Sequence, residues 1–172
     1  MSEFHRLIEQ QIPRLRRYAR ALTRNRDRAD DLVQDALSRA LEKEQFWQPG
    51  TDLGAWLFTI MHNQNVNNVR RDVRVSAMVD IELISTTLPA TTDPSASRKM
   101  VELDRALARL PLGQRQVILL VGLEGMSYEE TSRILGIPVG TVRSRLSRGR
   151  DTLRELLDME ERPAVAALPM AA

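Results

Sequence analysis

The sequence contains no cysteine, which excludes disulfide bonds and zinc sites built on thiolates. Histidine is nearly as scarce, because only His5 and His62 occur, far apart in the chain. No carboxylates cluster convincingly at the spacing of metal ligands. We therefore predict no metal site, no cofactor and no catalytic residue, and we expect a protein that is not an enzyme.

Long apolar runs are also missing, and the N-terminus is amphipathic rather than signal-like. We therefore expect a cytoplasmic protein without membrane insertion. Aromatic residues make up 4% of the 172 residues and hydrophobic residues 42%, which favours helices packed through Leu, Ile, Val and Ala. The net charge of +2 does not by itself indicate nucleic-acid binding, so the positions of the arginines matter more than their number.

Residues 125–146 have the pattern of a helix-turn-helix. Gly125 suits the left-handed position that follows a helix, and Ser127 with Glu130 three residues later forms a capping box. The segment 136–138 is short enough only for a sharp turn, and its proline suits the first turn of a new helix. These local signals agree on two short helices joined by a turn.

The second of these helices has two unlike faces. The inward face is predicted to contain Val139, Val142, Leu146 and Leu153. The opposite face contains Gly140, Ser144, Ser147 and Arg148, with Arg143 and Arg145 on its flanks. Small polar residues and arginines allow a helix to enter a major groove and to bond to bases and phosphates. An arginine-rich solvated helix is the less favoured alternative.

Two helices are predicted near the N-terminus. The first has the stripe Leu15, Tyr18, Ala19 and Leu22, with its regular part beginning near Pro13. The second is capped by Asn25 or Asp27 and has an apolar stripe from Ala29 to Leu41. Its outer face contains Asp31, Gln34, Asp35, Ser38 and Glu42. From composition alone, an acidic solvated face is the preferred explanation.

A third helix starts at Thr51 or Asp52 and is unusually rich in asparagine. Asparagine is a poor helix former, because its amide competes for backbone hydrogen bonds. The polar positions include Asn63, Asn65, Asn67, Asn68, Arg70, Arg71 and Arg74. Amides can pair with base edges and arginines with phosphates, so we weigh a nucleic-acid contact evenly against a frayed polar helix end.

The chain divides at a polar, proline-containing stretch around residues 85–95. Beyond it, two helices separated at Pro111 lead into the helix-turn-helix. We predict an all-α protein of two small helical domains, residues 1–80 and 98–160, joined by a flexible linker over 81–97. Residues 161–172 are predicted to form a disordered tail.

Several motifs resemble the group IV, or extracytoplasmic-function (ECF), sigma factors of the sigma-70 family. In the N-terminal domain these are residues 30–35 (DDLVQD) and Trp56-Leu57 followed by Ile60, Asn63 and Arg70-Arg71. In the C-terminal domain they are Leu110-Pro111, Arg115, Ser127–Glu130 and Gly140–Leu146. They run from about Leu15 to Leu157 in the family's order. Jointly they are specific, although a helix-turn-helix alone would fit many repressors.

The resemblance implies sigma regions 2 and 4, which bind core RNA polymerase and direct it to promoters. The polymerase-binding residues would be Asp31, Leu32, Gln34 and Asp35, on the helix that docks on the coiled coil of the largest subunit. The residues for the −10 element, where a base leaves the stack, would be Asn63, Asn67, Arg70, Arg71 and Arg74. The residues for the −35 element would be Gly140, Thr141, Arg143, Ser144, Ser147 and Arg148.

The resemblance also implies control by an anti-sigma factor and a role in a stress response. Val121 and Gly122 stand where many family members have a basic-then-acidic pair, so one common −35 contact is in doubt. A helix-turn-helix repressor or activator that acts without polymerase is the main alternative. The acidic helix face and the Asn/Arg helix argue against this alternative, since a simple repressor needs neither.

Overall fold

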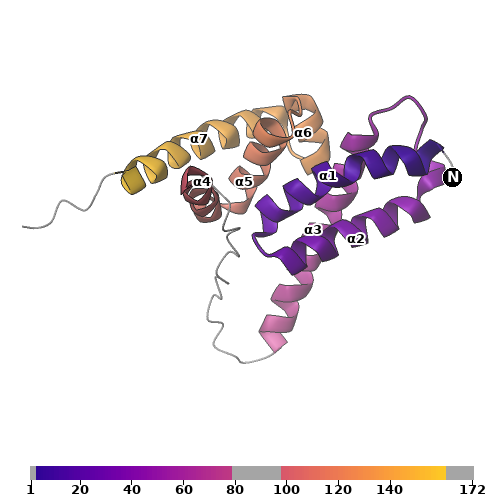
Figure 1. Cartoon of the computed structure of the whole chain (residues 1–172), viewed down its shortest axis with the longest axis horizontal. Helices are drawn as coiled ribbons and strands as arrows, with labels where there is room; N and C mark the ends of the chain where they lie inside the picture. Colours follow the sequence, from indigo (N-terminus) through magenta and orange to yellow (C-terminus); the bar gives the residue numbers. More distant parts are fainter. Residues whose placement is uncertain (1–2, 79–97, 162–172) are drawn as a thin grey trace, which may run out of the picture.

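A computed structural model describes residues 3–78 and 98–161, which contain helices and no strand (Figure 1). The α-helices are α1 (Glu3–Thr23), α2 (Arg26–Glu42), α3 (Leu53–Met78), α4 (Arg98–Arg109), α5 (Leu112–Ile118), α6 (Tyr128–Leu135) and α7 (Val139–Glu161). A 3₁₀ turn, η1 (Glu44–Phe46), follows α2, and a π-helical turn, η2 (Leu119–Leu123), follows α5. The predicted linker lies outside the described residues, as does the predicted tail beyond Glu161.

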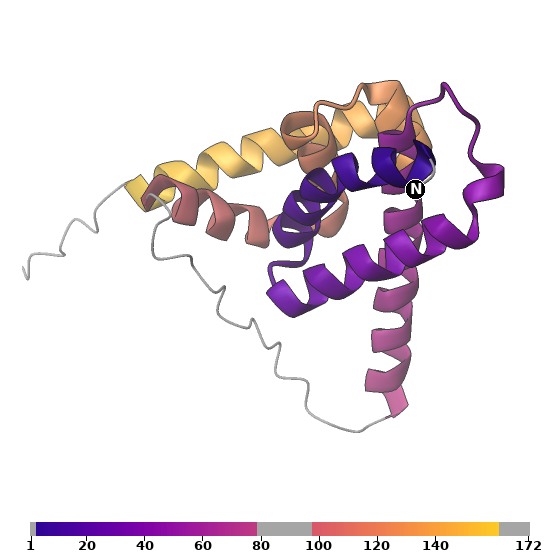
Figure 2. The ribbon, with the colours of Figure 1, turned by 45° about the vertical axis from the view of Figure 1, so that its right-hand side comes forward.

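Helices α1, α2 and α3 form the N-terminal module, and their local signals explain where they begin. The Asn25 side chain accepts a hydrogen bond from the backbone N–H of Arg28 at 2.9 Å, so Asn25 caps α2. The Asp52 side chain accepts from the backbone N–H of Ala55 at 3.0 Å at the start of α3. Both caps satisfy backbone donors that have no partner within the helix. The C-terminal half of α3 extends beyond the other helices (Figure 2).

The first helix is longer than the sequence suggested. Pro13 lies inside α1, although we expected the helix to begin near it. The residues before it are held by packing, because Phe4 and Ile8 are buried and the Phe4 ring lies 5.3 Å from that of Trp47. Tertiary burial therefore offsets the hydrogen bond that a proline removes from a helix interior.

Helices α4 to α7 form the C-terminal module, and its helix-turn-helix is confirmed. Ser127 and Glu130 make both bonds of the capping box, at 3.1 Å and 2.7 Å. Gly125 and Gly136 have φ values of 68° and 64°, the left-handed region that favours glycine. Of the predicted inward residues of the second helix, Val142 and Leu146 are buried and Val139 and Leu153 half-buried. Thr131, Ile134 and Leu135 of α6 are buried against them.

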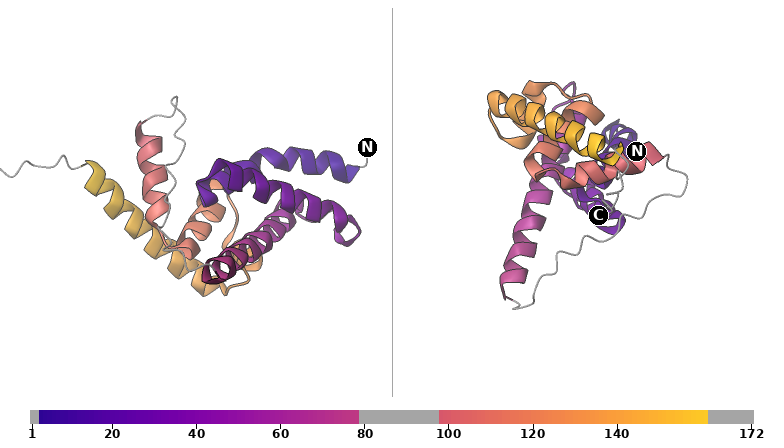
Figure 3. Two further views of the ribbon diagram at one scale, coloured as in Figure 1. Left: turned by 90° about the horizontal axis from the view of Figure 1, so that it is seen from below. Right: turned by 90° about the vertical axis from the view of Figure 1, so that its left-hand side faces the viewer.

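The two modules pack directly against each other. Helix α6 contacts α3, and the π-helical turn η2 contacts α1, so both sides of the predicted linker form one body (Figure 3). Nearly all the buried apolar residues of the two modules belong to one continuous cluster. The sequence predicted two domains joined by a linker and gave no prediction about a contact between them. No helix in the described ranges has both the length and the apolarity to cross a membrane.

Candidate nucleic-acid interface

The predicted −35 face of α7 is accessible in the structure. Gly140, Arg143, Ser147 and Arg148 are exposed, while Thr141 and Ser144 are half-buried. The Ser144 hydroxyl donates to the Thr141 carbonyl oxygen at 3.1 Å. The Arg143 guanidinium lies 5.9 Å from the centre of the Tyr128 ring, a distance at which a cation–π interaction restrains the side chain. Helix α6 therefore helps to orient one arginine of this face.

Arg145 does not belong to this outer face, although we expected it on the flank. It is half-buried and packs over Gly113 of α5. A Cβ atom at Gly113 would lie 2.9 Å from Arg145 Nη1, so the guanidinium occupies the space next to this glycine and would have to shift for a larger residue. Part of the Arg145 side chain is therefore used in packing α7 against α5.

The predicted −10 residues form one exposed row along α3. Asn63 and Asn67 are one helical turn apart and both exposed, as are Arg70, Arg71 and Arg74 toward the C-terminal end. Asn65, in contrast, is only 8% exposed and faces inward. Asn68 is half-buried and accepts a hydrogen bond from Arg71 at 3.3 Å, so Asn63 and Asn67 are the two fully exposed asparagines of α3.

The predicted polymerase face of α2 is exposed at three of its four positions. Asp31, Gln34 and Asp35 are exposed on the outer side of the helix. Leu32, which we expected among the contacts, is 1% exposed and belongs to the core. Its side chain cannot reach a partner in this structure, so its part is to hold α2 against its neighbours.

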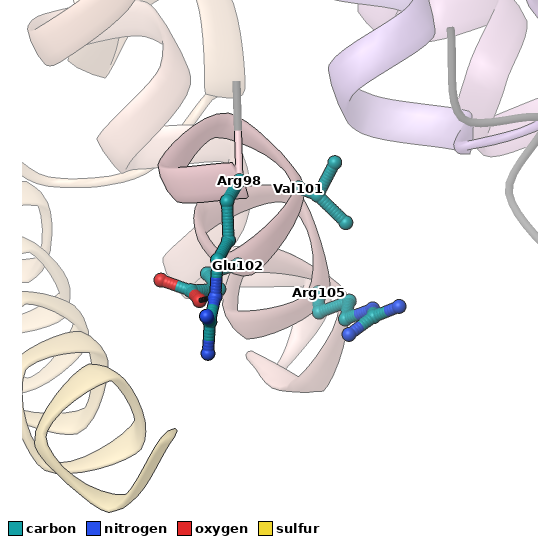
Figure 4. Close-up of a pocket in the computed structure, with 4 residues that line it drawn as sticks. All are labelled: Arg98, Val101, Glu102 and Arg105. Atoms are coloured by element: carbon teal, nitrogen blue, oxygen red, sulfur yellow. Dashed lines mark hydrogen bonds and ion pairs between the residues drawn. The ribbon is translucent and has the colours of Figure 1, made fainter. Parts of the chain in front are cut away.

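No metal-binding group is found among the described residues, since no three His, Asp or Glu side chains come together there. A shallow hollow on α4 is lined by Arg98, Val101, Glu102 and Arg105, and an ion pair of 2.8 Å joins Arg98 to Glu102 (Figure 4). It brings together none of the predicted site residues.

The sequence did not reveal a buried carboxylate between the modules. The side chain of Glu124 has no exposed surface and pairs with two arginines of α1, Arg14 and Arg17, each at 3.1 Å. These residues are more than 100 positions apart. The only local signal was an acidic residue between an apolar helix and Gly125, a position that would also fit a solvated helix end.

A second polar contact between the modules is made by Arg115 of α5. Its guanidinium donates to the carbonyl oxygens of Leu107, Ala108 and Leu110, near the end of α4. It also donates to the carbonyl oxygen of Leu22, near the end of α1, at 3.1 Å. Burial and the neighbouring Arg24 charge lower the pKa of Arg115, while Asp104 opposes this shift. One cation therefore serves the carboxyl ends of two helices from different modules.

Comparisons with known families assign both modules. Residues 8–62 match the family described as the sigma2 domain of PhyR, and residues 100–153 match sigma-70, region 4. Over 146 residues the chain is 42% identical to the ECF RNA polymerase sigma factor EcfG of Rhodopseudomonas palustris. This match covers 85% of the chain and 80% of the relative. The ECF RNA polymerase sigma factor SigE of Mycolicibacterium smegmatis is 37% identical over 163 residues, 91% of the chain and 62% of that relative.

A solved structure agrees with the sequence relatives. The sigma factor RpoE in complex with the anti-sigma factor NepR, from Bartonella quintana, superposes with a TM-score of 0.78 and 36% identity. It covers 93% of this chain and 99% of that chain. A helix-turn-helix module packed on a helical module with exposed amides and arginines defines a DNA-binding transcription protein. More specifically, the chain belongs to the ECF sigma factors of the sigma-70 family.

Proposed function

We propose that this ECF sigma factor uses three separate faces, on α2, α3 and α7, to direct promoter-specific transcription initiation. Residues 1–80 would form region 2 and residues 98–160 region 4, an assignment supported by the matched ranges 8–62 and 100–153. The observation that carries the proposal is the exposure of Asn63, Asn67 and the α3 arginines together with an exposed polar face on α7. A helix-turn-helix repressor that acts alone does not need the exposed row of asparagines and arginines on α3.

The α7 face is proposed to read the −35 element as duplex. Gly140 and Ser147 have small side chains, which let the helix backbone approach the base pairs closely. Arg143 and Arg148 are exposed and long enough to reach guanine edges or phosphates. Thr141 and Ser144 add hydroxyl groups on the same side. Tyr128 limits the conformations of Arg143 before DNA arrives, which lowers the entropy lost on binding.

The α3 row is proposed to hold −10 DNA in the single-stranded state. A base that leaves the stack costs a few kcal/mol, and hydrogen bonds to its edge offset this cost and distinguish one base from another. Asn63 and Asn67 can supply such bonds, since both side chains are exposed one turn apart. Arg70, Arg71 and Arg74 continue the row and suit the phosphates of the same strand.

Core RNA polymerase is proposed to bind the exposed acidic face of α2. Asp31, Gln34 and Asp35 point away from the core, so a basic partner surface can contact them without unfolding the helix. Leu32 is left out of this surface because it is buried. We further propose that the chain has no enzymatic activity of its own and acts in the cytoplasm.

Regulation by an anti-sigma factor completes the proposal. The solved relatives include RpoE bound to the anti-sigma factor NepR and CnrH bound to the cytosolic domain of CnrY. The second of these structures is 27% identical to this chain with a TM-score of 0.67. A partner of this kind, and a role in a stress response, are therefore proposed for this chain.

Run-off transcription with purified core polymerase tests the proposal. We expect promoter-specific transcripts only when this chain is added, and their loss with an Asp31→Arg/Asp35→Arg variant. A protein that binds duplex DNA but neither binds core polymerase nor yields transcripts would instead support a repressor or activator that acts alone.

A further inference from the structure

The most unusual group between the two modules is the carboxylate of Glu124. Its Oε2 accepts from Arg14 Nε at 3.1 Å, and its two oxygens accept from Arg17 Nη2, each at 3.1 Å. Arg17 Nε also donates to Oε1 at 3.2 Å. Four charge-assisted bonds therefore cross from α1 to the turn that precedes the helix-turn-helix.

Contacts within each module help to position both sides of this contact. Arg14 Nη1 donates to Gln11 Oε1 at 3.0 Å, and its guanidinium lies 5.7 Å from the centre of the Phe58 ring. A Cβ atom at Gly54 would lie 3.1 Å from Arg14 Nη1, so glycine leaves the space that this side chain occupies. The orientation of Arg14 is thus determined within the N-terminal module.

Glu124 is positioned by the π-helical turn η2. Its backbone N–H donates to the Leu119 carbonyl oxygen at 3.0 Å, which closes the wide turn, and its own carbonyl oxygen accepts from Arg14 Nη2 at 3.1 Å. A π-helical turn is rare in proteins, and η2 forms the last turn of the helical stretch that begins with α5. Here it places both the carboxylate and the backbone carbonyl of Glu124 against α1.

The burial of the three side chains is unequal, and this determines how the contact behaves. Glu124 has no exposed side-chain surface, whereas the side chains of Arg14 and Arg17 are 35% and 53% exposed. A buried charge that loses its partner is strongly disfavoured, while a half-exposed arginine can be hydrated instead. In the closed arrangement Glu124 therefore needs the two arginines as partners, whereas each arginine can also be stabilised by water.

We infer that Glu124 with Arg14 and Arg17 forms an interdomain latch, which holds the free chain closed and must open before the chain engages both promoter elements. This inference rests on the proposed function only in its second part. The −10 and −35 elements are named for their base-pair positions relative to the transcription start. They therefore lie roughly 25 base pairs apart, about 85 Å of duplex at about 3.4 Å per base pair. A compact chain of this length has a radius of gyration of about 16 Å, so two modules in contact cannot cover that span.

Other polar contacts between the modules support the same closed arrangement. Arg24 pairs with Asp104 at 3.0 Å, and Arg115 donates to the Leu22 carbonyl oxygen. The Asp104 side chain is 35% exposed, so water can replace its partner when the modules separate. Glu124 lacks that exposure, so in the closed form its charge is the one that most needs the arginines as partners.

The latch is testable on the free chain by measuring the distance between the two modules. Because the sequence has no cysteine, spin labels can be placed at the exposed positions Arg20→Cys on α1 and Arg105→Cys on α4, close to the Arg24–Asp104 ion pair of 3.0 Å that joins the modules. Distance distributions are then compared for the labelled parent, an Arg14→Gln/Arg17→Gln variant and a Glu124→Gln variant. Glu129→Gln, the same substitution at an exposed residue of α6, is the matched control.

We expect the parent and the Glu129→Gln control to show one short distance. Glu124→Gln should raise the ratio of long to short distances about tenfold or more, because it weakens bonds made to a charged group. Arg14→Gln/Arg17→Gln should raise this ratio further, since it leaves the carboxylate buried without a partner. Adding the two arginine changes to Glu124→Gln should then have a smaller effect than the same changes have in the parent.

Circular dichroism of each variant separates opening from unfolding, because opening leaves the helix content unchanged. If the arginine double variant loses helix content, the single Arg17→Gln variant replaces it, since Arg14 still pairs with Glu124. A parent that already shows long distances, or a folded Glu124→Gln variant with the parent's distribution, would overturn the latch.

Core polymerase binding distinguishes failure of the latch from failure of the proposed function. If binding needs the open form, a folded Glu124→Gln variant should bind core polymerase more tightly, by a factor up to its increase in open population. If the variant opens but does not bind core polymerase more tightly, the latch exists in the free chain. The second part of the inference, that the latch must open before promoter engagement, would then be wrong. An absence of polymerase binding by the parent would contradict the proposed function and leave the distance result unaffected.

Discussion

The side-chain amide nitrogen of Gln116 lies 3.4 Å from Nδ1 of His62, which joins α5 of the C-terminal module to α3 of the N-terminal module. With a neutral imidazole, Nδ1 can accept a hydrogen bond from the amide, whereas a protonated ring would require the amide to turn. Burial lowers the pKa of His62 below its ordinary value of 6.5. The contact between the modules therefore includes an imidazole whose protonation the folded chain disfavours.

We predict that this contact weakens in mild acid. Because the folded chain disfavours the imidazolium, the unfolded chain binds the proton first as the pH falls through 6.5. The stabilisation is therefore complete above the ordinary pKa and is lost as the pH falls from there toward the lowered value. Thermal unfolding between pH 7.5 and 5.5 checks this, and a His62→Gln variant should show a smaller pH dependence than the parent.

A second prediction separates the folding signals of the helix-turn-helix from its proposed reading face. Ser127→Ala removes the capping-box acceptor and should lower stability by about 1 kcal/mol, measured by thermal or urea unfolding. Ser147→Ala, at an exposed position of α7, should leave stability within about 0.5 kcal/mol and change −35 affinity or sequence preference. The reverse pattern would contradict the roles given to these two serines.

The helix-turn-helix was predictable because its signals are local. A capping box, two left-handed glycines and a 3.6-residue stripe lie within 22 residues of sequence, and each reports on its own neighbours. The pairing of Glu124 with Arg14 is different, since 110 positions separate them and the buried partner follows from tertiary packing alone. No periodicity in either segment indicates that these two side chains pair.

The sequence also could not predict whether single residues at the border of a predicted helix face are buried or exposed. Leu32 was predicted to contact a partner and Arg145 to flank the outer face of its helix, yet Leu32 is in the core and Arg145 packs over Gly113. A helical period places a residue on a side of a helix, but it does not say how far the neighbouring helices wrap around that side. Pro13 shows the same limit, because packing of Phe4 and Ile8 extends α1 past a residue that usually begins a helix.

The third prediction concerns the arginines of α7. Arg143→Ala and Arg148→Ala should each weaken binding to a −35 duplex by roughly 1–3 kcal/mol if they contact bases. If they contact only phosphates, affinity for all duplexes should fall alike and the salt dependence should flatten. Arg145→Ala is the informative control, since its loss should lower stability through α5 packing and leave sequence preference unchanged. Unchanged binding by both exposed-arginine variants would remove these residues from the site.

The fourth prediction concerns promoter opening. An Asn63→Ala/Asn67→Ala variant should bind −35 duplex normally but open promoters poorly, as measured by permanganate reactivity of unpaired thymines. The reason is that both exposed amides are proposed to bond to a base that has left the stack. Asn65→Ala serves as the control, because this buried residue should affect stability more than opening. Wild-type opening by the double variant would show that these amides do not read bases.

The last prediction concerns core polymerase. Asp31 and Asp35 are exposed on α2, whereas Leu32 and Val33 between them are buried in the core. An Asp31→Arg/Asp35→Arg variant should therefore remain folded, since exposed substitutions usually change stability by less than about 0.5 kcal/mol. It should still lose core polymerase in co-purification, because reversed charges at an interface repel the partner as well as leaving it unpaired.

The matched control for this variant is Glu155→Arg/Asp158→Arg, which makes the same change in net charge at two exposed positions of α7. The control should co-purify with core polymerase as the parent does, so that a loss seen only with the α2 variant is specific to that face. Both variants should melt like the parent and bind −35 duplex through the C-terminal module. If the α2 variant melts like the parent and still co-purifies, its acidic face is a solvated surface without a partner, and polymerase must bind elsewhere on the chain.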